Sequence, residues 1–201
     1  MNPVVQDDGP KILNRIHERG VALAIWKRAS PNGLAEWLGS LAPEQLPAGR
    51  FVSTIEHARS GLSTLCDIVG LAGPQRELLI DDVTTLVRAF GETIGRDRVD
   101  IRLEAVDHDS CWRFHHDYVG FRLNATYRGP GTQWPPLAHA ERAARAQRGY
   151  GGPLNEVAPF SAALFKGVKL AGKSALLHRS PPVAGRSVTR LLLCLNEEDD
   201  D

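Results

Sequence analysis

The hydrophobic pattern of the chain changes at Val99, and this change restricts the folds that the chain can adopt. Through the run Val99 to Ala105, apolar residues alternate with charged ones. Successive side chains of a strand leave opposite faces, so this alternation is typical of a half-buried strand. Before Val99, most apolar residues recur at helical spacing instead. The sequence therefore predicts a first half that mixes helices with a short strand, and a second half built from strands.

The first half carries start and stop signals for helices. Residues 11–18 are expected to be helical, and residues 21–26 form a short apolar strand. A second helix is expected after Ser30 and Pro31, because Ser is a common N-cap and Pro is tolerated in the first turn. A long third helix is expected to begin at Pro74 and to end at Gly95. Its apolar residues keep helical spacing: Leu78, Leu79, Val83, Leu86, Val87 and Phe90.

The second half is expected to hold the β core in residues 99–195, with residues 1–98 packed on it as a helical and mixed part of one globular domain. Further extended runs cover residues 114–127, 161–168, 174–178 and 188–195. Residues 137–158 interrupt them as an insertion, with a helix over Ala138 to Gln147 and a glycine-rich loop. This insertion is interpreted either as a lid over a substrate or as a solvated surface helix. The acidic residues 196–201 are expected to be a disordered tail.

Charge and cysteine content exclude several classes of partner and location. Lys plus Arg and Asp plus Glu both number 24, so no net charge would attract nucleic acid or an anionic membrane. The three cysteines are odd in number and widely spaced, which favours a reducing compartment over a disulfide framework. No signal peptide or membrane-spanning apolar run is recognised. We therefore expect a cytoplasmic protein whose partner is a small-molecule or protein substrate.

A candidate metal site follows from the spacing of His115 and Asp117. On a strand, side chains two residues apart leave the same face, so an imidazole and a carboxylate would converge on one point. His178 is the best third ligand, because it ends an apolar strand before a proline-rich turn. Two imidazoles and one carboxylate leave the other side of a metal open, as in non-haem Fe(II) oxygenases. No catalytic residue is expected beyond this metal centre.

Other interpretations of the same stretch stay open. His116 should point away from His115 if the strand is regular, which makes it a surface or supporting residue. A zinc site that uses Cys111 with histidines is conceivable, although the spacing matches no closed structural zinc pattern. Arg190 lies twelve residues beyond His178 on the next expected strand. Its guanidinium could hold an anionic cosubstrate through two hydrogen bonds.

Residues 99–195 resemble the double-stranded β-helix of the Fe(II)/2-oxoglutarate oxygenases. More specifically, the runs Phe114 to Asp117, Thr126 to Trp134 and His178 to Pro182 are similar to the bacterial family known as domain of unknown function 1826. The resemblance implies an α+β fold, with a jelly-roll (cupin-like) double-stranded β-helix core and N-terminal helices packed on it. It also implies that His115, Asp117 and His178 bind iron.

The resemblance further implies that Arg190 binds the distal carboxylate of 2-oxoglutarate. Tyr127 and Arg122 could contact this cosubstrate, but Tyr127 could instead be packed in the core, and Arg122 could form a surface ion pair. The chain departs from many oxygenases because residues 129–134 replace their Gly-Gly-acid-Leu stretch. Two functions therefore remain: an oxygenase that hydroxylates an unknown substrate, or a non-catalytic iron- or zinc-binding protein of metal homeostasis.

Overall fold

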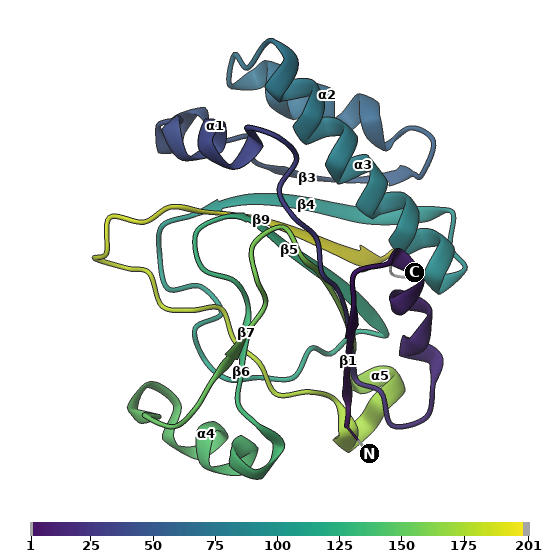
Figure 1. Ribbon diagram of the computed structural model, residues 1–201, viewed down its shortest axis with the longest axis vertical. Coiled ribbons are helices and arrows are strands. Elements are labelled where there is room, and N and C mark those ends of the chain that lie inside the picture. Colours follow the sequence, from purple (N-terminus) through teal and green to yellow (C-terminus); the bar gives the residue numbers. More distant parts are fainter. Residues whose placement is uncertain (1, 199–201) are drawn as a thin grey trace.

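A seven-stranded sheet forms the centre of the computed structural model, which describes residues 2–198. Its strand order is β1-β2-β8-β5-β9-β4-β3, and only β1 and β2 are parallel neighbours. Figure 1 shows the sheet between a layer of helices and a smaller β layer. The strands are β1 (Val4–Asp7), β2 (Leu23–Trp26), β3 (Gly49–Thr54), β4 (Arg98–Val106), β5 (Phe121–Arg128), β8 (Ala162–Lys166) and β9 (Arg190–Glu197).

The smaller layer faces the inner side of this sheet. Strand β6 (Gln133–Trp134) pairs with β7 (Asn155–Glu156), and single bridges join His115 to His178 and Gln133 to Arg179. Four short segments thus lie side by side. At the β2 and β8 end, apolar side chains from both layers fill the space between them, and they include Leu23, Trp134 and Phe165. Two facing β layers of this kind make a jelly roll, which confirms the expected fold class.

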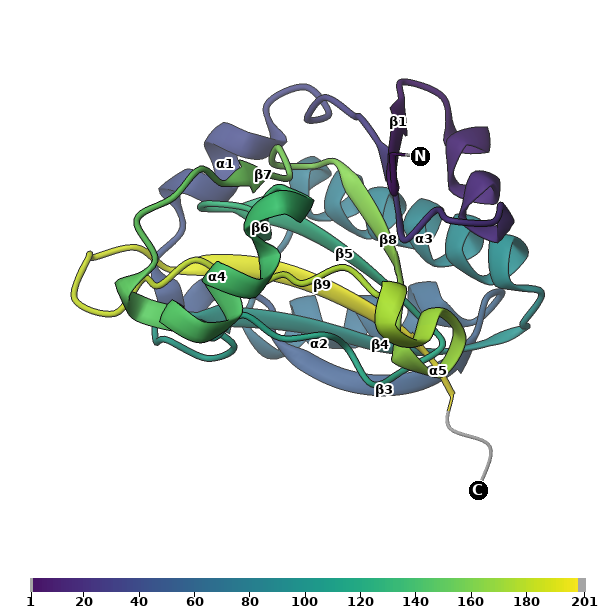
Figure 2. The ribbon, with the colours of Figure 1, turned by 90° about the horizontal axis from the view of Figure 1, so that it is seen from below.

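The outer face of the sheet is covered by helices α1 (Leu34–Ser40), α2 (Ala58–Ile68) and α3 (Pro74–Ile94), together with the 3-10 segment η1 (Pro10–His17) (Figures 1 and 2). Helix α3 begins and ends as its sequence predicts. Pro74 occupies the first turn, and Gly95 closes the helix in the left-handed conformation, with φ of 69°. Its buried face, which includes Leu79, Val83 and Phe90, packs into the main core.

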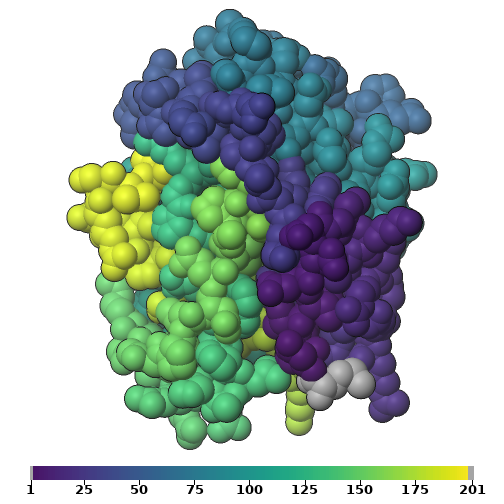
Figure 3. All heavy atoms as spheres, viewed as in Figure 1, coloured from purple at the N-terminus to yellow at the C-terminus, as the bar shows by residue number. Residues whose placement is uncertain are grey.

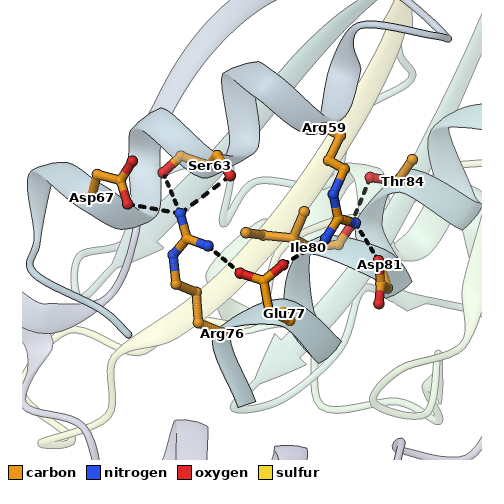
Figure 4. A network of polar contacts seen from close by, with 8 residues as sticks. All are labelled: Arg59, Ser63, Asp67, Arg76, Glu77, Ile80, Asp81 and Thr84. Atoms are coloured by element: carbon orange, nitrogen blue, oxygen red, sulfur yellow. Dashed lines mark hydrogen bonds and ion pairs between the residues drawn. The ribbon is translucent and has the colours of Figure 1, made fainter. Parts of the chain in front are cut away.

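Charged side chains join α2 to α3 on the solvent side (Figure 4). Arg59 forms ion pairs with Glu77 and Asp81, while Arg76 forms ion pairs with Asp67 and Glu77. The carboxylate of Glu77 therefore accepts hydrogen bonds from both guanidinium groups. Because Arg59, Glu77 and Asp81 are about half exposed, we expect each single pair to contribute little to stability.

The boundaries of the core differ from those predicted. The segment before residue 99 does not only pack on the core, because its strands β1, β2 and β3 lie in the main sheet, and β3 pairs with β4 along its whole length. At the other end, Asn196 and Glu197 belong to β9 and are not a disordered tail. Residues 199–201 of that predicted tail lie outside the described residues.

The insertion consists of helix α4 (Ala140–Ala146) between the 3-10 turns η3 (Leu137–His139) and η4 (Gln147–Gly149), and it ends in β7. Ala143 and Tyr150 pack on Phe114 and Leu177. The side-chain amide of Gln147 accepts a hydrogen bond from the N–H of Phe114 (2.9 Å) and donates one to its carbonyl oxygen (3.2 Å). The insertion is thus fastened to the residue that precedes His115.

The remaining short elements are η2 (Pro43–Gln45), α5 (Val168–Ala171) and η5 (Gly172–Ser174). In the space-filling view, the N-terminal segment (purple) and the insertion (green) cover different parts of the same face (Figure 3). Within residues 2–198, none of the helices combines the length and the apolar character that crossing a membrane requires.

Candidate metal centre

His115 and His178 lie opposite each other on two neighbouring segments of the smaller layer. The N–H of each residue donates to the carbonyl oxygen of the other, at 2.9 and 3.0 Å. This antiparallel bridge places both imidazoles on the inner face, with ring centroids 4.7 Å apart. The Nδ1 atoms lie 2.8 Å from the Arg113 carbonyl and 3.1 Å from the Leu176 carbonyl. Each Nδ1 therefore carries the proton, and each Nε2 lone pair is free to bind a metal.

Asp117 completes the group, although it lies in the loop before β5 and not on a strand. Its carbonyl accepts the N–H of Val168 at 2.8 Å. This close approach requires Gly167, because a Cβ there would lie 2.8 Å from the Asp117 carbonyl oxygen and 2.2 Å from that of Val119. The main chain around Asp117 is therefore fixed by the end of β8.

The carboxylate of Asp117 is 5% exposed and lies within reach of both imidazoles. Its Oδ1 is 3.6 Å from Nε2 of His115, and its Oδ2 is 3.2 Å from Nε2 of His178. Ligands at about 2.1 Å from a metal and at right angles to each other would lie about 3 Å apart. Among the described residues, only these three form a cluster of at least three ligand groups that could hold a metal ion.

The two oxygens of Asp117 have different surroundings. Oδ1 forms an ion pair with Arg122, whereas Oδ2 is buried and has no hydrogen-bond partner among the described residues. A buried carboxylate oxygen without a donor is costly, and a metal ion would satisfy it. Burial raises the pKa of Asp117, but the interactions with His115, His178 and Arg122 lower it by a larger amount. The net shift is downward, so the carboxylate is ionised. Contact with Asp117 also raises the pKa of His115.

A cavity of about 100 Å³ opens beside the three ligand groups, between the two β layers. Its walls combine His115 and His178 of the smaller layer with Arg122, Asn124 and Arg190 of the main sheet. Since one water occupies about 30 Å³ in the liquid, a few waters or a small organic acid would fill it.

Arg190 enters this cavity from β9 and is only 1% exposed. Its Nε donates to the Pro130 carbonyl at 2.8 Å, and one terminal nitrogen lies 3.5 Å from Oγ1 of Thr126. Burial lowers its pKa. It forms no ion pair with a carboxylate of the described residues. The charges of Glu156 and Glu104 act on it in the opposite sense and raise its pKa, but Glu156 accepts hydrogen bonds from Gly131 and Gln133, and Glu104 pairs with Arg102.

The structure separates Arg122 from Tyr127, although both lie on β5. Arg122 faces the cavity, where it pairs with Asp117. Tyr127 faces the helices, where its hydroxyl donates to Oδ2 of Asp82 at 2.6 Å and its ring packs on Phe160. The expectation that Tyr127 contacts a cosubstrate is therefore corrected. From Phe121 to Thr126, even-numbered residues of β5 face the cavity side and odd-numbered ones face the main core, because the side chains of a strand alternate.

Cys111 and His116 are not among the ligands. Cys111 is exposed at the edge of the cavity and does not belong to the metal-binding cluster, so the structure does not assemble the zinc site that was considered. His116 lines a separate cavity with Glu141 and Lys173, consistent with its expected direction. Burial lowers the pKa of His116.

Sequence reasoning missed two asparagines at this site. Asn124 lies between Arg122 and Thr126 on the cavity face of β5, and its buried Oδ1 has no hydrogen-bond partner among the described residues. Asn196, in the segment predicted to be disordered, accepts a hydrogen bond from Nε of Arg122 at 2.7 Å. The alternation along β5 could have indicated Asn124, since Arg122 and Thr126 share its face.

Comparisons with solved structures support the fold. The chain is similar to a dioxygenase for auxin oxidation (DAO) in rice, with a TM-score of 0.51, 13% identity, and coverage of 98% of this chain and 82% of the other. Weaker similarities are found to a Pseudomonas putida prolyl-4-hydroxylase (TM-score 0.44, 14% identity, 93% and 96% coverage) and to a full-length Neurospora crassa protein in complex with alpha-KG (TM-score 0.40, 12% identity, 96% and 83% coverage). At these identities, the likeness to the rice protein concerns the fold alone.

No significant match is found among curated proteins. A family model, however, matches residues 7–196, which is nearly the whole chain. The three runs that carried the resemblance in the sequence, including the two that hold His115, Asp117 and His178, lie within this match. The chain therefore belongs to the family described as protein of unknown function (DUF1826).

Proposed function

We propose that this protein is a non-haem Fe(II)/2-oxoglutarate-dependent oxygenase that hydroxylates a substrate still to be identified. One observation supports this most strongly. His115 and His178, which form a metal-binding cluster with the carboxylate of Asp117, line the same cavity as Arg190, a buried guanidinium that forms no ion pair with a described carboxylate. The first group suits a divalent metal, and the second suits an anion.

The donor set fits Fe(II). Neutral imidazoles and one ionised carboxylate match the ligands of non-haem iron oxygenases, which leave the other coordination positions open. His115 and His178 would bind through Nε2, and Asp117 through the oxygen that lacks a partner. The carbonyls of Arg113 and Leu176 would keep the imidazoles in the correct tautomer.

Arg190 fits the distal carboxylate of 2-oxoglutarate. An isolated buried cation is costly, and a bound carboxylate would compensate it with charge-assisted hydrogen bonds. Thr126 lies within reach of the same guanidinium and could add a donor. Iron and 2-oxoglutarate together would supply the chemistry, in which dioxygen, 2-oxoglutarate and a C–H bond yield succinate, carbon dioxide and an alcohol.

The protein's own contribution to this reaction is to bind and orient. Arg122 neutralises Asp117, the bridge between His115 and His178 fixes the two imidazoles, and the apolar end of the jelly roll excludes water from one side of the site. Iron(II) and free thiols both persist best under reducing conditions, and we therefore propose the cytoplasm as the place of action.

Turnover distinguishes this proposal from the alternative, a non-catalytic iron- or zinc-binding protein of metal homeostasis. Purified protein is supplied with Fe(II), 2-oxoglutarate, oxygen and a fractionated cell extract as a source of substrate, and succinate release is measured. We expect release that depends on both the extract and His178, with His178→Ala as the control. A wild-type protein that binds iron but never consumes 2-oxoglutarate would contradict the oxygenase and favour the metal-handling alternative.

A further inference from the structure

We propose that Asn196 and Asp100 are positioning residues of the metal centre. Through Arg122, they hold Oδ1 of Asp117, so that Oδ2, which has no hydrogen-bond partner among the described residues, is left to bind a metal. This inference rests on the proposed metal site, but it does not depend on 2-oxoglutarate or on oxygenase activity.

The contacts form one continuous anchoring network, made of Asp117, Arg122, Asn196, Asp100 and Arg50. Arg122 pairs with Oδ1 of Asp117 and donates from Nε to Oδ1 of Asn196 at 2.7 Å. Nδ2 of Asn196 donates to Oδ2 of Asp100 at 3.0 Å. Arg50 donates to both oxygens of Asp100, at 2.8 and 3.0 Å. The network thus runs from the candidate metal ligand to an arginine whose side chain is 64% exposed.

Strand register creates the middle of this network. Arg122 of β5 lies directly opposite Asn196 of β9, and Asn196 lies directly opposite Asp100 of β4. Directly opposed side chains on neighbouring strands are close enough to interact. If any of these strands shifted its register by one residue, the side chain that it contributes to the network would point to the other face of the sheet. The main sheet therefore sets the position of Arg122 through its neighbours β9 and β4.

Hydrogen-bond polarity fixes the direction of each group. An ionised carboxylate only accepts hydrogen bonds. Asp100 therefore turns the amide nitrogen of Asn196 toward itself, which leaves the amide oxygen facing Arg122. A guanidinium only donates, and it requires that oxygen. Asp100 is 4% exposed, and Arg50 compensates its buried charge. Along the network, each donor meets an acceptor. The thiol of Cys194 also lies 3.8 Å from the Asn196 oxygen.

The network matters because Asp117 lies in a loop. Its main chain is fixed near Gly167, and the ion pair with Arg122 restrains Oδ1 of its carboxylate. With Oδ1 engaged by Arg122, the carboxylate can offer one oxygen to a metal and leave further coordination positions free. Residues that orient metal ligands typically change metal affinity by about 10- to 100-fold when they are replaced.

The test is calorimetric titration of the metal-free full chain with Co²⁺, an air-stable substitute for Fe(II). Asn196→Leu keeps the side-chain size and removes both hydrogen bonds, and we expect it to weaken Co²⁺ binding about tenfold. The exchanged pair, Asp100→Asn with Asn196→Asp, restores an acceptor for Arg122 and a donor between the strands. We expect this pair to bind Co²⁺ within about threefold of the wild type, whereas Asn196→Asp alone places two carboxylates together and weakens binding.

Arg98→Ala is the matched control, because it removes the ion pair between β4 and Glu198, the residue that follows β9, without touching the network. We expect it to bind Co²⁺ as the wild type does. Equal affinities of Asn196→Leu and wild type, equal losses in Asn196→Leu and Arg98→Ala, or an exchanged pair no better than Asn196→Asp would each overturn the inference. If Asn196→Leu does not fold, the comparison of the exchanged pair with Asn196→Asp decides. A wild-type protein that binds no Co²⁺ would instead refute the metal centre itself.

Discussion

Arg190 places a positive charge in the wall of the cavity, on a residue that is only 1% exposed. It donates to a main-chain carbonyl, but the described residues provide no carboxylate for it. We therefore predict that Arg190→Met weakens 2-oxoglutarate binding by at least about tenfold, since a charge-assisted hydrogen bond contributes roughly 1.5–3 kcal/mol and about 1.4 kcal/mol corresponds to tenfold in affinity.

Two further measurements separate this role from a structural one. The affinity of Arg190→Met for Co²⁺ should equal that of the wild type. Its melting temperature should fall only a little, because the replacement removes the hydrogen bond to the Pro130 carbonyl but breaks no ion pair of the fold. A lower melting temperature with unchanged 2-oxoglutarate affinity would show that Arg190 serves stability.

His115, Asp117 and His178 should be individually required for metal binding. Because each supplies one of only three protein ligands, we predict that single replacement by Ala abolishes Co²⁺ binding in calorimetric titrations while the far-ultraviolet circular dichroism remains native. His116→Ala is the matched control, since its side chain lines a different cavity. If His116→Ala lost Co²⁺ binding while His115→Ala kept it, His116 and not His115 would be the metal ligand.

At the scale of elements, the insertion depends on Gln147. Its amide pairs with both main-chain groups of Phe114, as a neighbouring strand would. We predict that Gln147→Ala makes the segment 137–158 cleavable by trypsin at lower protease concentration, because these two main-chain groups lose their partners. Arg145→Ala is the control, because its ion pair with Glu141 is strongly exposed. Identical cleavage of Gln147→Ala and wild type would show that other contacts hold the insertion.

Elements with strong local signals could be predicted from the sequence, and those defined by partners could not. Helix α3 has a proline at its start, a glycine at its end and a periodic apolar face, and β4 alternates between apolar and charged residues from Val99 to Ala105. By contrast, β1 and β7 are short strands whose only reason for being extended is the neighbour they pair with. The smaller layer consists largely of isolated bridges, which leave no periodic pattern.

The candidate site follows the same division. His115 and Asp117 were found from local spacing, and Arg190 from its place on a strand. Tyr127 was misplaced because its position alone does not tell which face of β5 meets the helices. Asn196 was missed because its role depends on register with β4 and β5 across the sheet, which the sequence does not display.

For the whole molecule, metal affinity should depend on pH from the ordinary histidine pKa of 6.5 upward. Contact with Asp117 raises the pKa of His115 above its ordinary value of 6.5. Below that raised pKa the imidazole is protonated, and a metal must displace the proton. Co²⁺ affinity should therefore rise with pH through this range. Asp117, whose pKa is lowered, stays ionised throughout and adds no slope. An affinity that stays constant as the pH rises through and above 6.5 would contradict the assignment of His115 as a ligand.

The central claim is that one cavity binds Fe(II) and 2-oxoglutarate together. Its most direct test is an anaerobic titration of the metal-free protein, first with Fe(II) and then with 2-oxoglutarate, followed by visible absorption. We predict that a charge-transfer band appears only when both are present, that it is absent in His178→Ala, and that it requires more 2-oxoglutarate in Arg190→Met. Tight Fe(II) binding with no band at any 2-oxoglutarate concentration would contradict the claim.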